Sequence, residues 1–268
     1  MAKKANVYKD DGEKVSSITL PDVFDEFVRK DLISRAVLAV SANSRQKYGA
    51  APLAGKRHSV DVKKRRRDYK TCYGHGMSRV PRKVLSRSGT RFSWVSAFAP
   101  GTWGGRNAHP PKSQKNWEQK INIKERRLAI RSAIAATSDK EIVSARGHKF
   151  QEVTCILDDA CENIEKTKDV LLLLEKLGFT EELERIEGRQ IRAGKGKLRG
   201  RKYKSKTGPL IVVSKNCPLA KSAANIVGVD VVTVNFLNAA KLAPGCMPGR
   251  LTLWTKGAIE KLKDGLFA

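Results

Sequence analysis

Residues 210–234 read LIVVSKNCPLAKSAANIVGVDVVTV, in which two apolar runs, Leu210–Val213 and Val229–Val234, enclose a short helical segment near Pro218–Asn225. Strands of a parallel sheet are buried on both faces, so they appear in a sequence as short continuous apolar runs separated by helices. This stretch therefore predicts an α/β fold whose sheet is covered by helices on both faces.

Patterns on both sides of this stretch extend the same architecture. A turn at Asp11-Gly12 joins two strand-like segments, and several helix patterns begin just after a capping residue. We expect a strand pair at 6–9 and 15–20, helices starting after Asp31 and at Asn122 and Ser138, a strand at 153–157, helices at 161–177, 181–186 and 236–241, a strand at 251–254 and a helix from Thr255. These elements predict a single globular α/β domain, residues 1–48 and 116–268, with a mostly parallel sheet flanked by helices.

Residues 49–115 interrupt this body. They show no sustained period of a helix or a strand, and prolines and glycines punctuate them throughout. A loop longer than about 15 residues is unusual in a compact domain unless it is functional or disordered. We therefore expect one long, extended internal loop at 49–115.

Charge is concentrated in two segments. The chain carries 53 Lys and Arg against 27 Asp and Glu, a net charge of +26. Residues 45–115 hold 18 Lys and Arg but only two acidic residues, Asp61 and Asp68, and residues 189–206 hold nine Lys and Arg with no acidic residue. The rest of the chain is nearly neutral, so each basic segment needs an external polyanion to offset its self-repulsion.

Aromatic residues are interleaved with the cations of the loop. A solvated, disordered linker is the alternative interpretation, but such linkers are poor in aromatic residues. Aromatic rings stack on unpaired bases, and guanidinium groups pair with phosphates, so the loop predicts nucleic-acid binding. The aromatic residues are Tyr48, Tyr69, Tyr73, Phe92, Trp94, Phe98 and Trp103.

The tract 189–206 contains Gly194, Gly196 and Gly200, which superficially resemble a nucleotide-binding loop. Their spacing does not match GxGxxG, no strand is predicted before them, and no Gly-Lys-Ser/Thr follows at P-loop spacing. Dense Lys and Arg on a flexible support instead predict a second clamp for a phosphate backbone, inside the body.

No pattern of an enzyme or of a metal site is present. Cys72 and His75 could form half of a zinc site, but no second pair lies at a suitable spacing. The pairs Asp158-Asp159 and Glu181-Glu182 lie beside predicted helix starts, where capping explains them, and His148 is expected at a helix end. No GxSxG or HExxH motif occurs. We expect neither an enzyme, nor a cofactor, nor a metal site of the protein's own.

Seven segments together resemble the family of universal large-subunit ribosomal protein four, in its archaeal and eukaryotic branch. They are LPDVF (20–24), VRKDLISRAV (28–37), PLAGKR (52–57), SRVPR (78–82), GGRNAHPPK (104–112), KERRLAIRSAIAAT (124–137) and ARGHKF (145–150). After residue 150 the similarity lies mainly in the order of elements and in GPLIVV (208–213).

The resemblance implies an α/β domain on the outer surface of the large subunit and a loop that penetrates ribosomal RNA as far as the nascent-peptide exit tunnel. In this interpretation the rRNA-binding residues are Arg45, Lys47, Lys56, Arg57, Lys63, Lys64, Arg65, Arg66, Arg67, Arg87, Arg91, Trp94, Trp103, Arg106, His109, Lys112, Arg189, Arg192, Lys195, Lys197, Arg199, Arg201, Lys202 and Lys204. The loop tip at the tunnel is Gly74, His75, Gly76, Met77, Ser78, Arg79, Val80, Pro81 and Arg82.

The expected partners are large-subunit rRNA, neighbouring ribosomal proteins and the nascent polypeptide, with any Mg²⁺ carried by the rRNA. We expect no homo-oligomer and no membrane, because no apolar run approaches the ~20 residues that span a bilayer. The start of the chain shows no apolar signal segment, and the odd number of cysteines argues against disulfides, so a cytoplasmic protein is expected.

Two alternatives remain open from the sequence. One is an RNA-modifying α/β enzyme with a basic docking loop, which predicts a cofactor site at the strand ends. The other is an RNA-binding regulator that acts outside the ribosome. Sedimentation with the large subunit discriminates both from a structural ribosomal protein.

Overall fold

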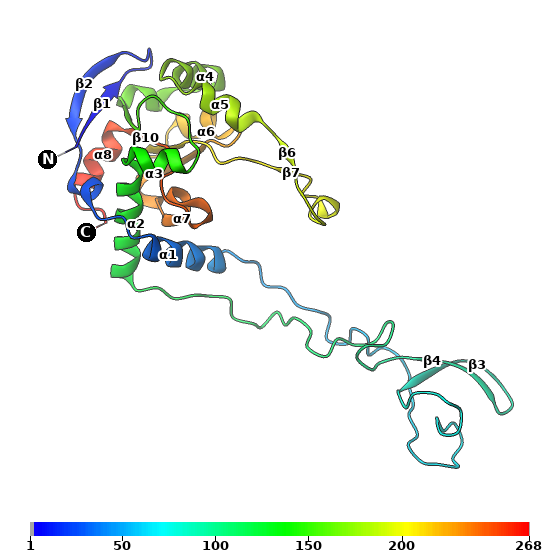
Figure 1. Ribbon diagram of the computed structural model, residues 1–268. Coiled ribbons are helices and arrows are strands. Elements are labelled where there is room, and N and C mark those ends of the chain that lie inside the picture. The colour runs from blue at the N-terminus through cyan, green and yellow to red at the C-terminus, as the bar shows by residue number, and fades with distance from the viewer. Residues whose placement is uncertain (1–2, 268) are drawn as a thin grey trace. The chain divides into compact units, whose positions relative to one another are not determined.

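The computed structural model describes residues 3–267. It divides into two compact units: unit 1 combines the chain up to Ser44 with the chain from Glu118, and unit 2 is Arg45–Trp117. Unit 1 is the α/β body, and unit 2 contains the whole of the basic loop (Figure 1).

Unit 1 is built around a six-stranded sheet of order β2-β1-β5-β10-β8-β9, in which only β2 runs antiparallel to its neighbour. The strands are β1 (Lys4–Tyr8), β2 (Lys14–Thr19), β5 (Thr154–Leu157), β8 (Leu210–Val213), β9 (Asp230–Thr233) and β10 (Thr252–Thr255). The mostly parallel sheet confirms the predicted fold class.

Helices cover both faces of this sheet. The helices are α1 (Lys30–Asn43), α2 (Ile123–Thr137), α3 (Lys140–Ala145), α4 (Thr167–Lys176), α5 (Thr180–Glu187), α6 (Pro218–Ala224), α7 (Ala239–Leu242) and α8 (Lys256–Lys263). Short 3-10 turns occupy Asp22–Asp25, Asp159–Asn163, Lys197–Arg199, Val234–Phe236 and Pro244–Cys246.

The side chains of β8 point alternately to the two faces of the sheet, and each face is covered by a hydrophobic core. Leu210 and Val212 join the core formed with α1, α2, α7 and α8, whereas Ile211 and Val213 join the core formed with α3, α4, α5 and α6. Successive side chains of a strand point to opposite faces, so a strand between two helical layers must be apolar at every position. Trp254 of β10 fills the first core, where its ring meets Phe24 edge-on at 5.4 Å.

Several predicted helix starts are wrong by one or more residues. Asp31 is not an N-cap: α1 begins at Lys30, and the Asp31 carboxylate accepts a hydrogen bond from the Arg29 guanidinium at 2.6 Å. Asp139 rather than Ser138 caps α3, by accepting from the backbone N–H of Glu141 at 3.0 Å. The predicted helix at 161–177 is instead a 3-10 turn followed by α4.

Unit 2 contains a β-hairpin that the sequence interpretation missed. Strands β3 (Arg82–Ser88) and β4 (Arg91–Ser96) pair antiparallel, and the register joins Ser88 to Arg91 across a two-residue loop. Gly89 adopts a positive φ of 56°, as the first position of such a tight hairpin loop requires. The prediction that the segment has no strand of its own is therefore wrong.

A buried ionic cluster links α5 to the segment before β5. The Glu182 carboxylate contacts His148 Nδ1 at 2.6 Å and accepts hydrogen bonds from the Arg185 guanidinium at 2.6 and 2.7 Å. It also accepts from the Lys149 backbone N–H at 3.0 Å, and Arg185 donates to the Thr207 carbonyl at 2.7 Å. Glu182 lies in the first turn of α5, as the sequence predicts, and His148 follows closely after α3, but both side chains are buried against each other, which the sequence does not predict. Through Arg185 and Thr207 the cluster ties α5 to the end of the basic tract.

We expect this cluster to make stability depend on pH below about 4.5. Burial alone would raise the pKa of Glu182, but the hydrogen bonds from Arg185, His148 and Lys149 lower it from 4.5 to about 2. Because the folded pKa is the lower one, the stabilisation is present above pH 4.5 and is lost as the pH falls toward 2, on the order of 3 kcal/mol in total.

Chemical denaturation of wild type and Glu182→Gln at pH 7, 4 and 2 measures this contribution. The difference between the two unfolding free energies should be largest at pH 7 and shrink at pH 2, where wild type is also protonated. A difference that stays constant over this range contradicts the assignment to Glu182.

Candidate nucleic-acid interface

Two chain segments run side by side at one end of unit 2. The Ala50 N–H donates to the Pro111 carbonyl at 3.0 Å, and a Cβ added at Gly49 would lie 2.6 Å from the Ser113 nitrogen. Only glycine permits this close approach of backbone to backbone. The outgoing and returning segments are therefore fixed against each other here.

Trp117 is the centre of a stack at the same end of unit 2. The Tyr48 ring lies nearly parallel to the indole, with centroids 6.0 Å apart, while the Arg45 guanidinium carbon and Lys115 Nζ lie 3.9 and 4.4 Å from the ring centroid. The sequence interpretation included Arg45 but missed Trp117, which lies two residues beyond the boundary drawn at residue 115. The Arg45 cation is held on an aromatic platform in this stack.

Trp103 is 98% exposed on a tight turn. Thr102 Oγ1 donates to the Ala99 carbonyl at 2.8 Å, and the Arg106 N–H donates to the Phe98 carbonyl at 3.2 Å. A Cβ at Gly105 would lie 2.2 Å from the Ala99 oxygen, so this turn cannot relax around a larger residue. An indole held in water on a fixed turn is suited to stack on a partner that excludes the water.

The hairpin carries a row of aromatic rings with cations over them. Phe92 lies 5.6 Å from Trp94 and 5.5 Å from Tyr69, centroid to centroid. Lys70 Nζ lies 5.9 Å from the Tyr69 and Phe92 rings, and the Arg87 guanidinium carbon lies 5.5 Å from Tyr69. Ring faces and cations therefore occur together, as in surfaces that bind single-stranded nucleic acid.

Arg82 at the end of the predicted tip points inward. It is 8% exposed, and its guanidinium donates to the Ser78 carbonyl, to Ser78 Oγ at 3.2 Å and to the Val80 carbonyl at 3.4 Å. Its backbone also pairs with Asp61. Arg82 therefore stabilises the 78–82 turn, whereas Arg79 is exposed and stacks on Tyr73 at 4.5 Å.

The second basic tract forms a narrow hairpin on unit 1, and Figure 1 shows it extending from α5. Its strands are β6 (Gln190–Ile191) and β7 (Tyr203–Lys204). Arg192 holds the two sides together by donating to the carbonyls of Arg201 at 3.1 Å and Tyr203 at 3.3 Å. At the far end Leu198 is 88% exposed among lysines and arginines.

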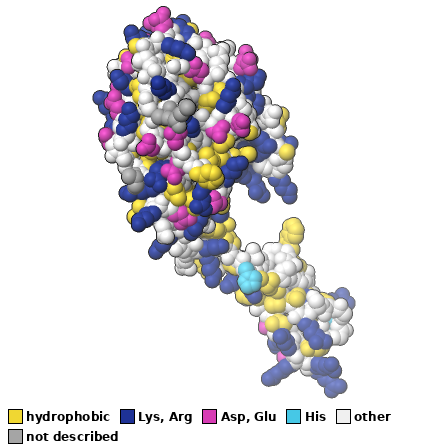
Figure 2. Space-filling view, turned by 60° about the vertical axis from the view of Figure 1, so that its left-hand side comes forward, with side chains coloured by type: hydrophobic (Ala, Val, Ile, Leu, Met, Phe, Trp, Pro, Cys, Tyr) yellow, Lys and Arg dark blue, Asp and Glu magenta, His cyan; other side chains and the backbone are white. Residues whose placement is uncertain are grey.

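The predicted RNA-contacting residues lie at the surface. Lys63, Trp94, Arg106 and Arg192 are half-buried, and the other predicted contact residues are exposed. In the predicted tip only Arg82 is buried. Figure 2 shows acidic side chains scattered among the cations of unit 1, whereas Lys and Arg dominate unit 2. The predicted set falls into two groups, one in unit 2 and one in the hairpin of unit 1.

Strand ends are where an α/β enzyme would bind its cofactor. Here the buried Glu162 carboxylate accepts hydrogen bonds from the Ser214 N–H at 2.8 Å, Ser214 Oγ at 2.9 Å and Thr255 Oγ1 at 2.8 Å. Ser214 and Thr255 lie at the carboxyl ends of β8 and β10, so Glu162 braces these two strand ends together.

Two further properties concern the described residues only. Within 3–267 no group of three or more His, Cys, Asp or Glu side chains could hold a metal ion. None of the helices in this range is long and apolar enough to cross a membrane.

Comparison with known proteins extends the similarity along the chain. The sequence profile of the Ribosomal protein L4/L1 family matches residues 18–265. The chain is 48% identical over 259 residues to the large ribosomal subunit protein uL4 of Nanoarchaeum equitans, covering 96% of this chain and 97% of that protein. It is 45% identical over 265 residues to the uL4 of Methanococcoides burtonii, covering 98% of this chain and 98% of that protein. It is 43% identical over 265 residues to the uL4 of Archaeoglobus fulgidus, covering 98% of this chain and 99% of that protein.

The match continues through the second half of the body, where the motifs found in the sequence alone were few. Both the basic loop and the basic hairpin lie inside the matched range. The chain belongs to the ribosomal protein L4/L1 family.

Proposed function

We propose that this protein is a structural constituent of the large ribosomal subunit, which binds rRNA through unit 2 and through the hairpin at 189–206. The observation that carries the proposal is the separation of charge: a net +16 within residues 45–115 and +9 within 189–206, against a nearly neutral remainder. Counterion release from the RNA backbone supplies the binding affinity, and the aromatic residues stack on unpaired bases.

The relatives support this function. The curated proteins that match over almost the whole chain are named as large ribosomal subunit proteins, not as enzymes. In this role the protein needs no cofactor, and its partners are rRNA, neighbouring ribosomal proteins and, at the tip, the nascent polypeptide. Its location would be the cytoplasm, within the ribosome.

We place the tip Gly74–Arg82 at the peptide exit tunnel, with one refinement. Because Arg82 is used inside unit 2, the residues that would face the tunnel are the exposed ones, among them Ser78 and Arg79. Gly74 and Gly76 have φ values of 80° and 66°, so the turn presents His75 between two glycines.

Deletion of residues 56–100 tests the proposal. Unit 1 has two hydrophobic cores of its own, so we expect the shortened chain to keep a cooperative unfolding transition. The deletion removes 13 of the 18 Lys and Arg of residues 45–115, so incorporation into large-subunit particles of an archaeal host should fall severalfold or more. The measurement is quantitative mass spectrometry of sucrose-gradient fractions, with full-length chain as the reference.

Full-length protein that stays out of the large-subunit fraction at moderate salt would overturn the proposed function. A shortened chain that incorporates as well as the full-length chain would show that unit 2 does not provide the binding. A shortened chain that no longer folds would show that unit 1 depends on unit 2.

A further inference from the structure

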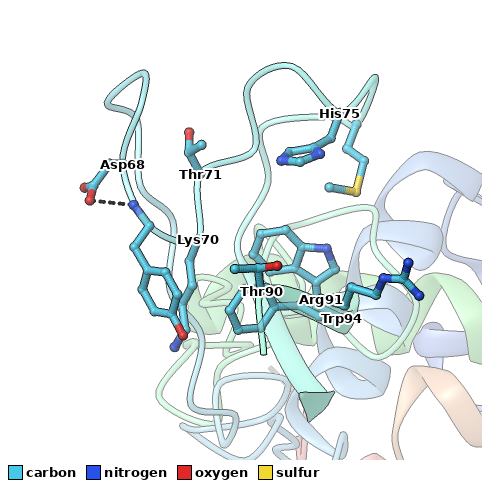
Figure 3. A pocket seen from close by; sticks show the side chains of 10 residues that line it. Asp68, Lys70, Thr71, His75, Thr90, Arg91 and Trp94 are labelled. Carbon is cyan, nitrogen blue, oxygen red and sulfur yellow. Dashed lines mark hydrogen bonds between the residues drawn. The ribbon is translucent and has the colours of Figure 1, made fainter. Parts of the chain in front are cut away.

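The hairpin of unit 2 encloses a cavity of about 800 Å³. Its wall on the hairpin side includes Thr90, Phe92 and Trp94, and its other wall includes Thr71, His75 and Met77. Figure 3 shows His75 and Trp94 on opposite sides of the opening. The volume lies within the range of roughly 300–1,000 Å³ found for pockets that bind small molecules.

We propose that this cavity binds one unpaired nucleotide of an RNA strand, with the base stacked on the Trp94–Phe92 row and the phosphate near the surrounding cations. This inference rests on the proposed function, since it names the RNA element that unit 2 would take. It goes further because it brings Tyr69, Lys70 and Phe92 into one built site, whereas the sequence names the two aromatic residues only as part of a dispersed set and does not single out Lys70.

The ring faces are the first support for a base. Phe92 and Trp94 are two residues apart in β4, so their side chains lie on the same face of the hairpin. Both are half-buried, whereas their neighbours Ser93 and Val95 on the opposite face are exposed. The interplanar angle of 30° between the Phe92 and Trp94 rings leaves a shallow aromatic surface, on which any base can stack.

Charge is the second support. Lys63, Lys70, Arg87 and Arg91 lie in or beside the cavity, and Asp68 is the one carboxylate among the residues that line it. Asp68 Oδ1 accepts from the Tyr69 N–H at 2.7 Å and lies 3.5 Å from Lys63 Nζ. The Asp68 carboxylate is thereby already bound within the protein, and the net positive charge around the cavity favours binding of a phosphate.

Backbone strain is the third support. Arg67 and Lys70 adopt φ values of 56° and 63°, which are rare for residues other than glycine, and they bracket Asp68 and Tyr69. Strained conformations cluster where the surrounding structure holds a binding surface in place. The turn that presents Tyr69 and Lys70 is therefore shaped before a ligand arrives.

A peptide segment is the competing occupant. Met77 is the only aliphatic side chain in the lining of this cavity, and the rest is aromatic, hydroxyl-bearing or charged. An apolar peptide would need aliphatic side chains to pack against, and this lining supplies only Met77. Aromatic faces beside cations match a nucleotide better, because they satisfy its base and its phosphate together.

The test uses the full chain and a short single-stranded RNA that carries one 2-aminopurine, whose fluorescence is quenched when it stacks on an aromatic ring. We expect quenching by wild type and by Trp94→Phe, which keeps an aromatic ring. Trp94→Ala should lose the quenching and weaken binding roughly tenfold, because one base stack contributes about 5- to 150-fold.

His75→Ala removes the opposite wall. It should also reduce quenching and, because His75 is exposed between two glycines, it leaves the hairpin folded. If Trp94→Ala fails to fold, the His75→Ala variant therefore still tests whether the base binds in this cavity. Val95→Ala, on the other face of β4, is the matched control and should behave as wild type.

Millimolar adenosine monophosphate should restore the fluorescence by competing for the cavity. Quenching that survives both Trp94→Ala and His75→Ala overturns this assignment but leaves the proposed function intact, since the RNA is still bound. Quenching relieved by an apolar peptide and not by the nucleotide assigns the cavity to a peptide and also overturns it. Failure of wild type to bind the RNA at all overturns the proposed function and this inference with it.

Discussion

Replacing Arg250 with methionine is expected to lower the free energy of unfolding by about 2–4 kcal/mol, because two backbone carbonyls lose their donor, although Arg250 lies far from any proposed RNA contact in the sequence. Its side chain is 1% exposed at the amino-terminal end of the sheet. The guanidinium donates to the carbonyls of Gly208 at 2.8 Å and Lys241 at 3.0 Å and forms an ion pair with Asp230 at 2.8 Å. Methionine fills similar volume but leaves the Gly208 and Lys241 carbonyls without the Arg250 donor, whereas Asp230 is 41% exposed and keeps its contact with Lys241 Nζ at 3.1 Å.

Urea denaturation at pH 7 measures this effect. Arg29→Met is the matched control, because Arg29 forms an ion pair of 2.6 Å with Asp31 in which both side chains are about half exposed. An exposed pair contributes only about 0–1 kcal/mol, so this control should unfold close to wild type. If Arg250→Met were equally mild, the buried contacts of Arg250 would be too weak to anchor the entry to β8.

The same contact explains how a stable body supports a basic hairpin. Thr207 and Gly208 follow directly on the tract 189–206, and their carbonyls accept hydrogen bonds from Arg185 and Arg250 respectively. The returning side of the hairpin therefore joins the body at two successive carbonyls, each held by an arginine. Most cations of the hairpin are exposed, but the point where the hairpin joins the body is held in place by these hydrogen bonds.

The body was predictable because its pattern is local and strong. Four consecutive apolar residues at Leu210–Val213 have few alternatives to a buried strand, and the parallel sheet follows from several such runs separated by helices. The confirmed turn at Asp11-Gly12 is equally local, since Gly12 has a φ of 79°.

Contacts between distant residues were not predictable in this way. Glu182 and His148 are 34 residues apart, and nothing near either residue indicates that they meet in the core. Each was interpreted by its nearest helix end, which is the strongest local explanation for a charged residue there. In the structure the two side chains are buried against each other, a contact that no local pattern predicts.

The missed hairpin has a different cause. Residues 91–96 do alternate, with Phe92 and Trp94 on one face, and Gly89-Thr90 is a suitable two-residue loop. The alternation spans only six residues, and the other face carries Arg91 and Ser93 rather than a uniform type. A period of two over six residues is too short to distinguish a strand from a loop in a segment this rich in cations. The period nevertheless places Phe92 and Trp94 on one face.

Neutralising three adjacent cations of unit 2 is expected to have the largest effect on RNA binding. Lys64, Arg65 and Arg66 are exposed, and among the described contacts their side chains form no ion pair with an acidic residue. Changing all three to glutamine removes three positive charges without unpairing a carboxylate. The fold of unit 2 should persist, because the hydrogen bond from Thr71 at this place uses the backbone carbonyl of Arg65.

The dependence of affinity on salt is the informative measurement. Each phosphate contact contributes about 0.7 to 0.9 to the slope of log K against log salt concentration, depending on whether the strand is single or double. Loss of three contacts should therefore reduce the slope by about 2 to 3 and weaken binding to an rRNA fragment tenfold or more at moderate salt. The titration is done by filter binding between low and moderate salt.

A matched control separates contacts from net charge. Lys140, Lys166 and Lys168 are exposed on unit 1, outside both basic segments, and changing them to glutamine lowers the net charge by the same amount. If the slope reports phosphate contacts, this control keeps the wild-type slope and loses little affinity. If both triple variants shift the slope equally, the RNA responds only to the total charge of +26, and the location of the cations in unit 2 has no special role. Equal slopes for wild type and the Lys64, Arg65 and Arg66 variant would mean that this exposed run faces away from the RNA, which would move the interface to the aromatic face of the hairpin.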